Sequence, residues 1–275
     1  MARLVSNYKL LMPRIFSAFI MLIIFLSSLF LFSGEIFPFI IYLSSLLALY
    51  EWSKLLKFNT EQKNIFLITS VIIIYFIGRY SEDDNGRLIL LLSSIFWVCV
   101  APLFLIFNPR LKNFLLGSLI GWLIVIPLII SFNYLISLGP WIVLLVLTSI
   151  WLADSGAYFF GKQFGKRKLA PLISPGKTWE GFIGAIFVVT LFSIAMVYFK
   201  FVDSYSSILF FNLVLVLSVE GDLFESYIKR MAKVKDSGDL IPGHGGVLDR
   251  IDSLCSSLPF ATLILISPSF FGRII

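Results

Sequence analysis

The stretch Phe114-Leu-Leu-Gly-Ser-Leu-Ile-Gly-Trp-Leu-Ile-Val-Ile-Pro-Leu-Ile-Ile-Ser-Phe132 decides the fold class, because it contains no charged residue. An apolar helix of about 20 residues is long enough to cross the hydrocarbon core of a bilayer. The whole chain shares this character, since 59% of its 275 residues are hydrophobic and only 14% are charged. Soluble domains are about 25% charged. The sequence therefore predicts an all-α, polytopic transmembrane protein.

Similar apolar runs recur on both sides of this stretch, separated by short charged or turn-rich breaks. They predict about nine spans: 15–32, 36–50, 65–80, 88–107, 114–132, 141–161, 181–199, 207–226 and 251–271. The basic residues before the first run would also suit a signal peptide. That run, however, ends in Ser33-Gly34-Glu35 rather than in a small-residue cleavage site, which favours an uncleaved first helix.

The distribution of Lys and Arg predicts the orientation. With the N-terminus in the cytosol and nine crossings, 18 of the 22 basic residues fall on the cytosolic side. The cytosolic segments are then 1–14, 51–64, 108–113, 162–180 and 227–250. This asymmetry agrees with the positive-inside rule and places the C-terminus outside. It also accounts for the net charge of +6, so nucleic acid need not be invoked as a partner.

The two halves of this single membrane unit differ in their loops. Residues 1–140 have short, plain connections and are expected to form a scaffold, whereas 141–275 contain the two largest cytosolic loops and are expected to hold the site. Gly117 and Gly121 form a GxxxG pattern, which favours close helix contact inside the fold or between subunits and so leaves a homodimer open. The two cysteines indicate neither a disulfide framework nor a zinc site.

Acidic residues in apolar runs point to a functional site, because an uncompensated charge in a membrane is costly. Asp154 lies within one such run, and Glu220, Asp222 and Glu225 lie within another. Helical spacing places Asp222 on one stripe with Ser226 and with Lys229 or Arg230. Asp249 and Asp252 follow at the start of the next helix. Carboxylates on two neighbouring helices, with basic side chains beside them, can hold Mg²⁺ bridged to phosphates.

The loop between these two helices contains Lys235, Asp236 and the stretch Pro242-Gly-His-Gly-Gly246. Its proline and glycines exclude a continuous helix, and glycines let backbone N–H groups approach phosphate oxygens. His244 is the only histidine of the chain. Because this surrounding offers no apolar face to pack against, we expect His244 to bind or position rather than to act as a base.

A second basic loop contains Ser174-Pro-Gly-Lys177-Thr178. Gly-Lys-Thr suggests a P-loop, but that motif requires glycine at 171, where Pro171 stands, and no strand is expected before it. A phosphate-binding loop of another kind is the alternative, with Lys177 as its charge. The neighbouring Lys166–Lys168 are explained by topology alone.

The residues from Ser226 to Asp252 resemble a known signature. Ser226-x-Ile-Lys229-Arg230, Lys235-Asp236-x-Gly and Ile241-Pro-x-His244-Gly245-Gly246-Val-x-Asp249-Arg250-Ile-Asp252 fill every constrained position of the phosphatidate cytidylyltransferase (CDP-diacylglycerol synthase) signature. Ala153–Tyr158 and Ser174–Thr178 also look like motifs of that family. The resemblance covers the second half specifically and the first half only in hydropathy.

The resemblance implies the reaction of CTP with phosphatidate to give CDP-diacylglycerol and pyrophosphate, dependent on Mg²⁺, at the cytosolic face of a bacterial plasma membrane. It implies that Asp222 and Asp249 hold the metal, and that Lys177 reaches the triphosphate or the lipid phosphate. The expected catalytic residues are Asp222, Lys229, Arg230, Lys235, Asp236, His244, Asp249 and Arg250. The expected substrate-binding residues are Asp154, Ser174, Lys177, Thr178, Ser226, Gly245 and Gly246.

Two other readings use the same residues differently. A related CTP-dependent enzyme would act on another lipid phosphate or on a lipid alcohol. A transporter of anionic substrates would also place ionisable residues in helices, but it predicts repeated halves and broken helices at mid-membrane. Neither feature is visible, and the charges cluster at one face.

Overall fold

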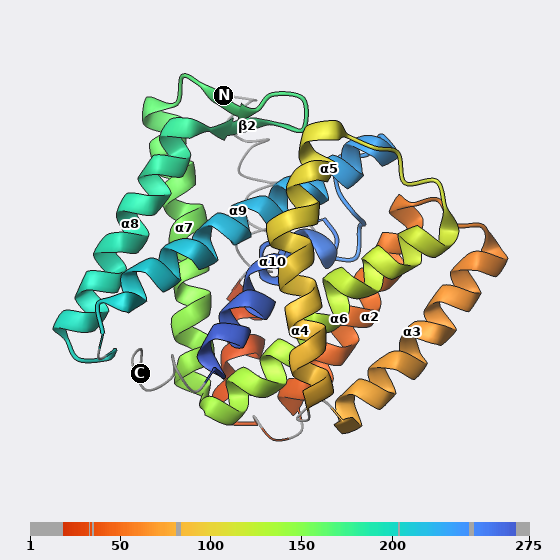
Figure 1. Ribbon diagram of the computed structural model, residues 1–275, viewed down its shortest axis with the longest axis horizontal. Helices are drawn as coiled ribbons and strands as arrows, with labels where there is room; N and C mark the ends of the chain where they lie inside the picture. The colour runs from red at the N-terminus through yellow and green to blue at the C-terminus, as the bar shows by residue number, and fades with distance from the viewer. Residues whose placement is uncertain are drawn as a thin grey trace, which may run out of the picture.

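The computed structural model describes residues 19–32, 34, 36–80, 84–202, 204–241 and 245–267. After a first helix, Phe19–Phe30, the chain forms helices joined by short connections and one small hairpin (Figure 1). The elements are α2 (Ile36–Leu55), α3 (Thr60–Tyr80), α4 (Asp84–Ile95), the π-helical turn η1 (Phe96–Val100), α5 (Ala101–Phe107), α6 (Phe114–Leu138), α7 (Pro140–Phe164), β1 (Lys168–Ala170), β2 (Ser174–Thr178), α8 (Trp179–Tyr198), α9 (Ser206–Ala232) and α10 (Leu248–Leu265).

Seven of the described helical stretches are long and apolar enough to cross a membrane. They are α2, Thr60–Ile77 of α3, the continuous Asp84–Phe107, α6, α7, α8 and α9, and they correspond to the second to eighth predicted spans. The polytopic helical class is therefore confirmed. The first predicted span begins before the described residues, and α10 is not among the seven, so the count of nine stays a prediction.

The hairpin β1–β2 departs from the predicted all-α class. Lys168 pairs with Thr178 and Ala170 with Ser174 in antiparallel register. The prediction that no strand precedes Ser174-Pro-Gly-Lys-Thr was therefore wrong, because β1 lies directly before it and the motif itself is β2. A P-loop is still excluded, because Pro171 replaces its first glycine and the two strands pair with each other.

The GxxxG pattern of α6 is used inside the chain. The indole of Trp52 on α2 donates a hydrogen bond to the carbonyl oxygen of Gly117 at 2.9 Å. A Cβ on Gly121 would lie 2.6 Å from Cδ1 of the same indole, so only glycine admits this contact. The two glycines thus allow α2 to pack closely against α6. This contact inside the chain accounts for the GxxxG pattern, so the pattern no longer favours a homodimer.

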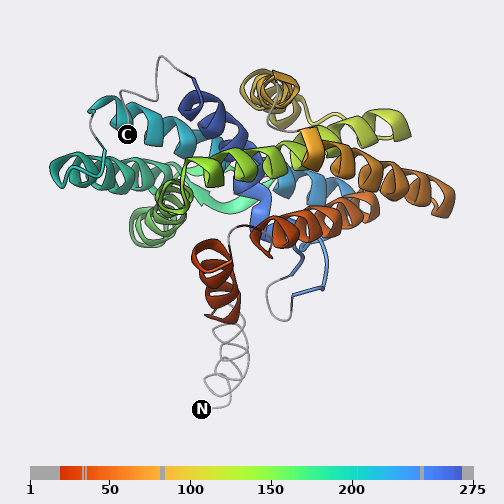
Figure 2. The ribbon, with the colours of Figure 1, turned by 90° about the horizontal axis from the view of Figure 1, so that it is seen from below.

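Helices α7 and α8 lie side by side at one edge of the bundle, and α9 crosses its centre beside α10 (Figure 1). Small residues allow both close approaches: a Cβ on Gly156 of α7 would lie 3.2 Å from Cα of Ala185 on α8. Between α9 and α10, Ser256 donates to the carbonyl oxygen of Leu217 at 2.7 Å. The helix Phe19–Phe30 projects from this bundle (Figure 2). The acidic stretches of α9 and α10 are consequently held together at the centre.

Candidate active site

A cavity of about 480 Å³ lies between α7, the hairpin, α8 and α9. Its lining includes predicted site residues from three elements: Asp154 of α7, Ser174, Lys177 and Thr178 of β2, and Asp222 of α9. Tyr158 and Phe182 supply apolar surface. Cavities of this volume, with few convergent polar groups among apolar side chains, are typical of small-molecule sites.

Lys177 and Asp222 form the charged centre of this cavity. The ammonium of Lys177 lies 2.7 Å from Oδ2 of Asp222 and donates to the carbonyl oxygen of Val219 at 3.3 Å. The side chains remain 24% and 33% exposed, respectively, so both can be reached from the cavity. Ser226, one turn along α9, donates to Oδ1 of Asp222 at 3.4 Å. Together with Asp154 and Lys162, which also line the cavity, this pair presents two carboxylates and two ammonium groups to a ligand.

The hairpin holds Lys177 in place through contacts at both of its ends. The hydroxyl of Thr178 caps the N-terminus of α8 by accepting from the N–H of Gly181 at 3.1 Å. The carboxylate of Glu180 accepts from the N–H groups of Lys166 and Arg167 at 3.0 and 3.1 Å. The guanidinium of Arg230 donates to the carbonyl oxygen of Ile173 at 3.2 Å, which ties the hairpin to α9.

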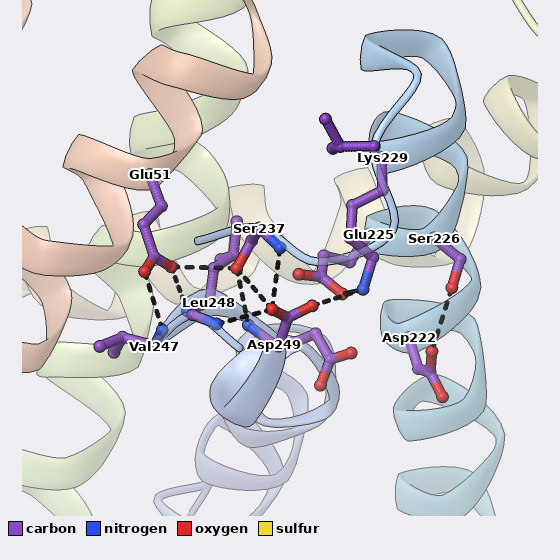
Figure 3. Close-up of polar contacts among 12 residues, drawn as sticks. Glu51, Asp222, Glu225, Ser226, Lys229, Ser237, Val247, Leu248 and Asp249 are labelled. Carbon is purple, nitrogen blue, oxygen red and sulfur yellow. Dashed lines mark hydrogen bonds and ion pairs between the residues drawn. The ribbon is translucent and has the colours of Figure 1, made fainter. Parts of the chain in front are cut away.

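A second, more deeply buried cluster centres on Lys229. Its ammonium contacts Glu225 within α9 and donates to Oδ1 of Asp249 on α10 at 2.6 Å (Figure 3). The three side chains are between 4% and 10% exposed. In this arrangement Lys229 joins α9 to α10 and does not face the open cavity.

The other carboxylate oxygen of Asp249 holds the signature loop. Oδ2 accepts from the N–H and the hydroxyl of Ser237 at 2.8 and 2.9 Å, and from the N–H of Gly246 at 2.8 Å. Burial raises the pKa of Asp249, but the hydrogen bonds from Lys229, Gly246 and Ser237 outweigh it and hold the pKa below its usual value. Asp249 is therefore an ionised, fully bonded anchor.

Gly245 shows why the loop requires glycine beside Asp249. Its φ is +80°, in the left-handed region, and a Cβ there would lie 2.7 Å from Oδ2 of Asp249. Its carbonyl oxygen accepts from the N–H of Ile241 at 2.9 Å, which closes the loop on itself. Both ends of the described loop are thus fixed around one carboxylate.

The structure brings some predicted site residues together and leaves others at the surface. Asp154, Ser174, Lys177, Thr178 and Asp222 line the cavity, with Ser226 beside Asp222. Lys229, Asp249, Gly245 and Gly246 meet around the loop. Lys235, Asp236 and Arg250 are exposed, as is Arg230, which contacts the hairpin instead of the carboxylates. His244 lies outside the described residues.

The roles of two residues, Glu225 and Glu51, were not predicted from the sequence. Glu225, singled out only as an acid in an apolar run, is the helical partner of Lys229 four residues away, a spacing that could have indicated the pair. Glu51 contacts the loop from α2. The predicted second span ended at residue 50 and placed Glu51 in a loop, whereas α2 continues to Leu55.

The residues present fit Mg²⁺ in donor type and in charge. Asp154 and Asp252 interact electrostatically with Asp222 and Lys177, so several carboxylates share few ammonium groups. Neighbouring carboxylates repel one another, and a bound cation or a proton relieves this repulsion. Among the residues that the structure describes, no three acidic, His or Cys side chains form a metal cage. Mg²⁺ is commonly bound by one or two carboxylates together with substrate phosphates.

The fold is that of a multi-pass membrane protein, and the chain belongs to the cytidylyltransferase family, whose sequence profile matches residues 12–267. It is therefore a nucleotidyltransferase. The resemblance found in the signature is thereby confirmed. The phosphatidate cytidylyltransferase of Haemophilus influenzae is 35% identical over 281 aligned residues, which cover 91% of this chain and 97% of that protein. The phosphatidate cytidylyltransferase of Pseudomonas aeruginosa is 34% identical, over 93% of this chain and 97% of its own length. The protein of that name from Staphylococcus aureus is 48% identical over 128 residues.

Proposed function

We propose that this protein transfers the cytidylyl group of CTP to phosphatidate, giving CDP-diacylglycerol and pyrophosphate. The observation that carries the proposal is the cavity with Lys177 and Asp222 at its centre, in a chain that matches two phosphatidate cytidylyltransferases along almost its whole length. The cavity is bounded by α7, α8 and α9, which are long and apolar enough to cross a membrane, so a lipid phosphate and a soluble nucleotide can both reach it.

The chemistry requires a phosphate oxygen of phosphatidate to attack the α-phosphorus of CTP. The bond from that phosphorus to the bridging β-phosphate oxygen breaks, and pyrophosphate leaves with the bonding electrons. The attacking phosphate is already an anion, so no covalent enzyme intermediate and no general base are required. Lys177, 24% exposed on the cavity wall, can neutralise a phosphate in this step. Positioning and charge neutralisation supply most of the rate in such transfers.

Mg²⁺ would be held by Asp222, with Asp249 as the second expected ligand, and would supply charge neutralisation at the triphosphate. Asp222 suits this role because its side chain is 33% exposed in the cavity. Asp249 would have to share a carboxylate that already accepts from Lys229, Ser237 and Gly246. If Asp249 binds the metal, it therefore does so while it also holds the loop through Ser237 and Gly246.

We further propose that the site faces the cytosol of a bacterial plasma membrane. The distribution of Lys and Arg places the segments 51–64, 108–113, 162–180 and 227–250 on one side of the membrane, and the first three all contact the fourth. Glu51 contacts Val247, Pro109 contacts Tyr227, and Ile173 contacts Arg230. Elements assigned to the other side also meet, since the rings of Phe30 and Trp141 lie 4.7 Å apart and those of Phe37 and Phe132 lie 5.6 Å apart. Both groups of contacts support the predicted alternation of the spans, and the excess of Lys and Arg on the first side supports its assignment to the cytosol.

The test is to incubate the purified protein with CTP, Mg²⁺ and a panel of lipids: phosphatidate, an isoprenoid phosphate and diacylglycerol. We expect CDP-diacylglycerol from phosphatidate alone, with one pyrophosphate released for each product. Product formation from diacylglycerol or from the isoprenoid phosphate, with none from phosphatidate, would reassign the lipid substrate. Pyrophosphate release that needs CTP but not phosphatidate would refute direct transfer.

A further inference from the structure

Glu51 is a buried carboxylate that the half expected to be a scaffold contributes to the signature loop. It lies near the end of α2 and is only 1% exposed. The neighbouring Trp52 is fixed to α6 by its hydrogen bond to Gly117, so the backbone that carries Glu51 is firmly placed. A buried carboxylate is retained only where hydrogen bonds compensate for the loss of water. Those bonds all go to the loop and to α10.

The carboxylate of Glu51 caps the N-terminus of α10 from another helix. Oε1 accepts from the N–H of Val247 at 3.0 Å, and Oε2 accepts from the N–H of Leu248 at 2.8 Å (Figure 3). The N-cap residue of α10, Val247, makes no side-chain cap of its own. The first N–H groups of a helix need acceptors, and its dipole favours a negative charge there. Glu51 meets both needs.

Ser237 connects Glu51 to Asp249. Its hydroxyl oxygen lies 3.0 Å from Oε2 of Glu51 and 2.9 Å from Oδ2 of Asp249. A serine hydroxyl carries one proton, so the two carboxylates share one donor. The N–H of Ser237 donates to Asp249 as well, at 2.8 Å. A displaced Glu51 would therefore move Ser237, and with it the partner that orients Asp249.

Two glycines of the loop admit Glu51. A Cβ on Gly238 or on Gly246 would lie 2.5 Å from Oε1 of Glu51, a distance that real Cβ atoms do not adopt. The bare backbone at these positions thus lets the carboxylate approach the loop. Glu51 is absent from the lining of the 480 Å³ cavity and contributes instead to a separate cavity of about 390 Å³, which is lined in part by the end of α2 and by loop residues 236–240.

We propose that Glu51 is a positioning residue of the active site, which holds Ser237, Val247 and Leu248 and, through Ser237, fixes Asp249 in its place against Lys229. The proposal rests on the function proposed above. It predicts that Glu51 acts on turnover and on the order of the loop, not on nucleotide affinity.

The first experiment compares Glu51→Gln and Glu51→Ala with Ser53→Ala. Ser53 is a matched control because it is equally buried on α2 but, within the described part of the chain, its hydroxyl bonds to the Tyr50 carbonyl oxygen of its own helix alone. Replacement of residues that orient a reactive group costs about 10–100-fold in activity. We expect kcat to fall by that factor in Glu51→Gln and further in Glu51→Ala, with KM for CTP within about twofold of wild type. Ser53→Ala should keep wild-type kcat.

Two further readouts separate positioning from general damage. Hydrogen exchange of the peptide covering residues 245–250 should become faster in Glu51→Gln and stay unchanged in Ser53→Ala. The double variant Glu51→Gln/Ser237→Ala should lose no more kcat than the worse single variant, because the two residues act along one path. Fully multiplicative losses would overturn the proposal.

Other outcomes would also overturn it. Wild-type kcat and wild-type hydrogen exchange in folded Glu51→Gln would show that the loop does not need Glu51. A raised KM for CTP with unchanged kcat would show that Glu51 contacts the nucleotide from the 390 Å³ cavity. Failure of the wild-type protein to turn over CTP with phosphatidate would refute the proposed function instead, and hydrogen exchange would still report on Glu51 alone.

Discussion

Asp222→Asn and Asp249→Asn should both abolish turnover but differ in stability, because the two carboxylates have different surroundings. Asp222→Asn removes one ion pair, with Lys177, in which both side chains are partly exposed. Pairs of this kind contribute about 1 kcal/mol or less. Asp249→Asn places an amide where one carboxylate accepts from the ammonium of Lys229 and from three donors of Ser237 and Gly246. Breaking a buried pair by replacing one partner costs about 3–5 kcal/mol.

The expected thermal shifts follow from these energies. For a chain of this size, about 1 kcal/mol corresponds to a few degrees in Tm. Asp222→Asn should therefore unfold within a few degrees of wild type, whereas Asp249→Asn should lose on the order of 10 °C. Loss of one preorganised electrostatic contact lowers kcat by about 10²–10³-fold. We expect each variant to reach that loss, and the double variant to be hardly worse in turnover, since groups that act together are not additive.

The assay is CDP-diacylglycerol formation from labelled CTP across a Mg²⁺ titration, with thermal unfolding of the same detergent samples. Near-wild-type turnover of either folded variant at low Mg²⁺ would show that this residue is not a ligand. The metal would then have to be sought at Asp236, Asp252 or Asp154. Equal Tm values for both variants would refute the anchoring role of Asp249.

Three further outcomes are expected. Lys177→Ala should lower activity without loss of membrane insertion, because 17 basic residues remain on the cytosolic side; the exposed Lys112→Ala is the control, and unchanged kinetics for both substrates would reduce Lys177 to a topological charge. Cysteines engineered in 162–180 and 227–250 of a Cys99→Ser background should escape impermeant labelling from outside intact cells; labelling of either loop would reverse the orientation. Chelation by EDTA should abolish product formation and added Mg²⁺ should restore it, whereas persistent activity in EDTA would exclude the cation.

The sequence predicts the membrane-spanning helices well because most residues of each one are apolar, and a hydropathy profile detects such runs directly. It also singles out Asp222, whose charge lies within an apolar run, and Lys177, which lies in a basic loop with a Gly-Lys-Thr sequence; both line the cavity. The hairpin β1–β2 was missed because its strands are three and five residues long and include Pro175 and Gly176, which give no strand pattern. These short strands are held together from just beyond their ends, because the N–H of Trp179 donates to the carbonyl oxygen of Arg167 and Glu180 accepts from the N–H of Lys166.

Long-range partners were the part that the sequence did not reveal. Glu51 and Ser237 are 186 positions apart, and no local spacing connects them. Their contact depends on α2 packing against α6 through Trp52, which is a tertiary event. Lys229 was expected among the catalytic residues, yet the structure surrounds it with two carboxylates, Glu225 of α9 and Asp249 of α10. Side chains that complete a site from distant elements become visible only once the helices are placed.

The pairing within α9 bears on how the chain enters the membrane during synthesis. Glu225 and Lys229 are four residues apart on one helix, so they can neutralise each other as soon as α9 is helical. A neutralised pair partitions into lipid more readily than two separate charges. Asp249 reaches Lys229 only after α10 has been translated. Glu51 is translated much earlier, but its partners Val247 and Leu248 also belong to the start of α10. The charges of α9 can thus pair within their own helix during synthesis, whereas Glu51 and Asp249 find their partners only once α10 has been made.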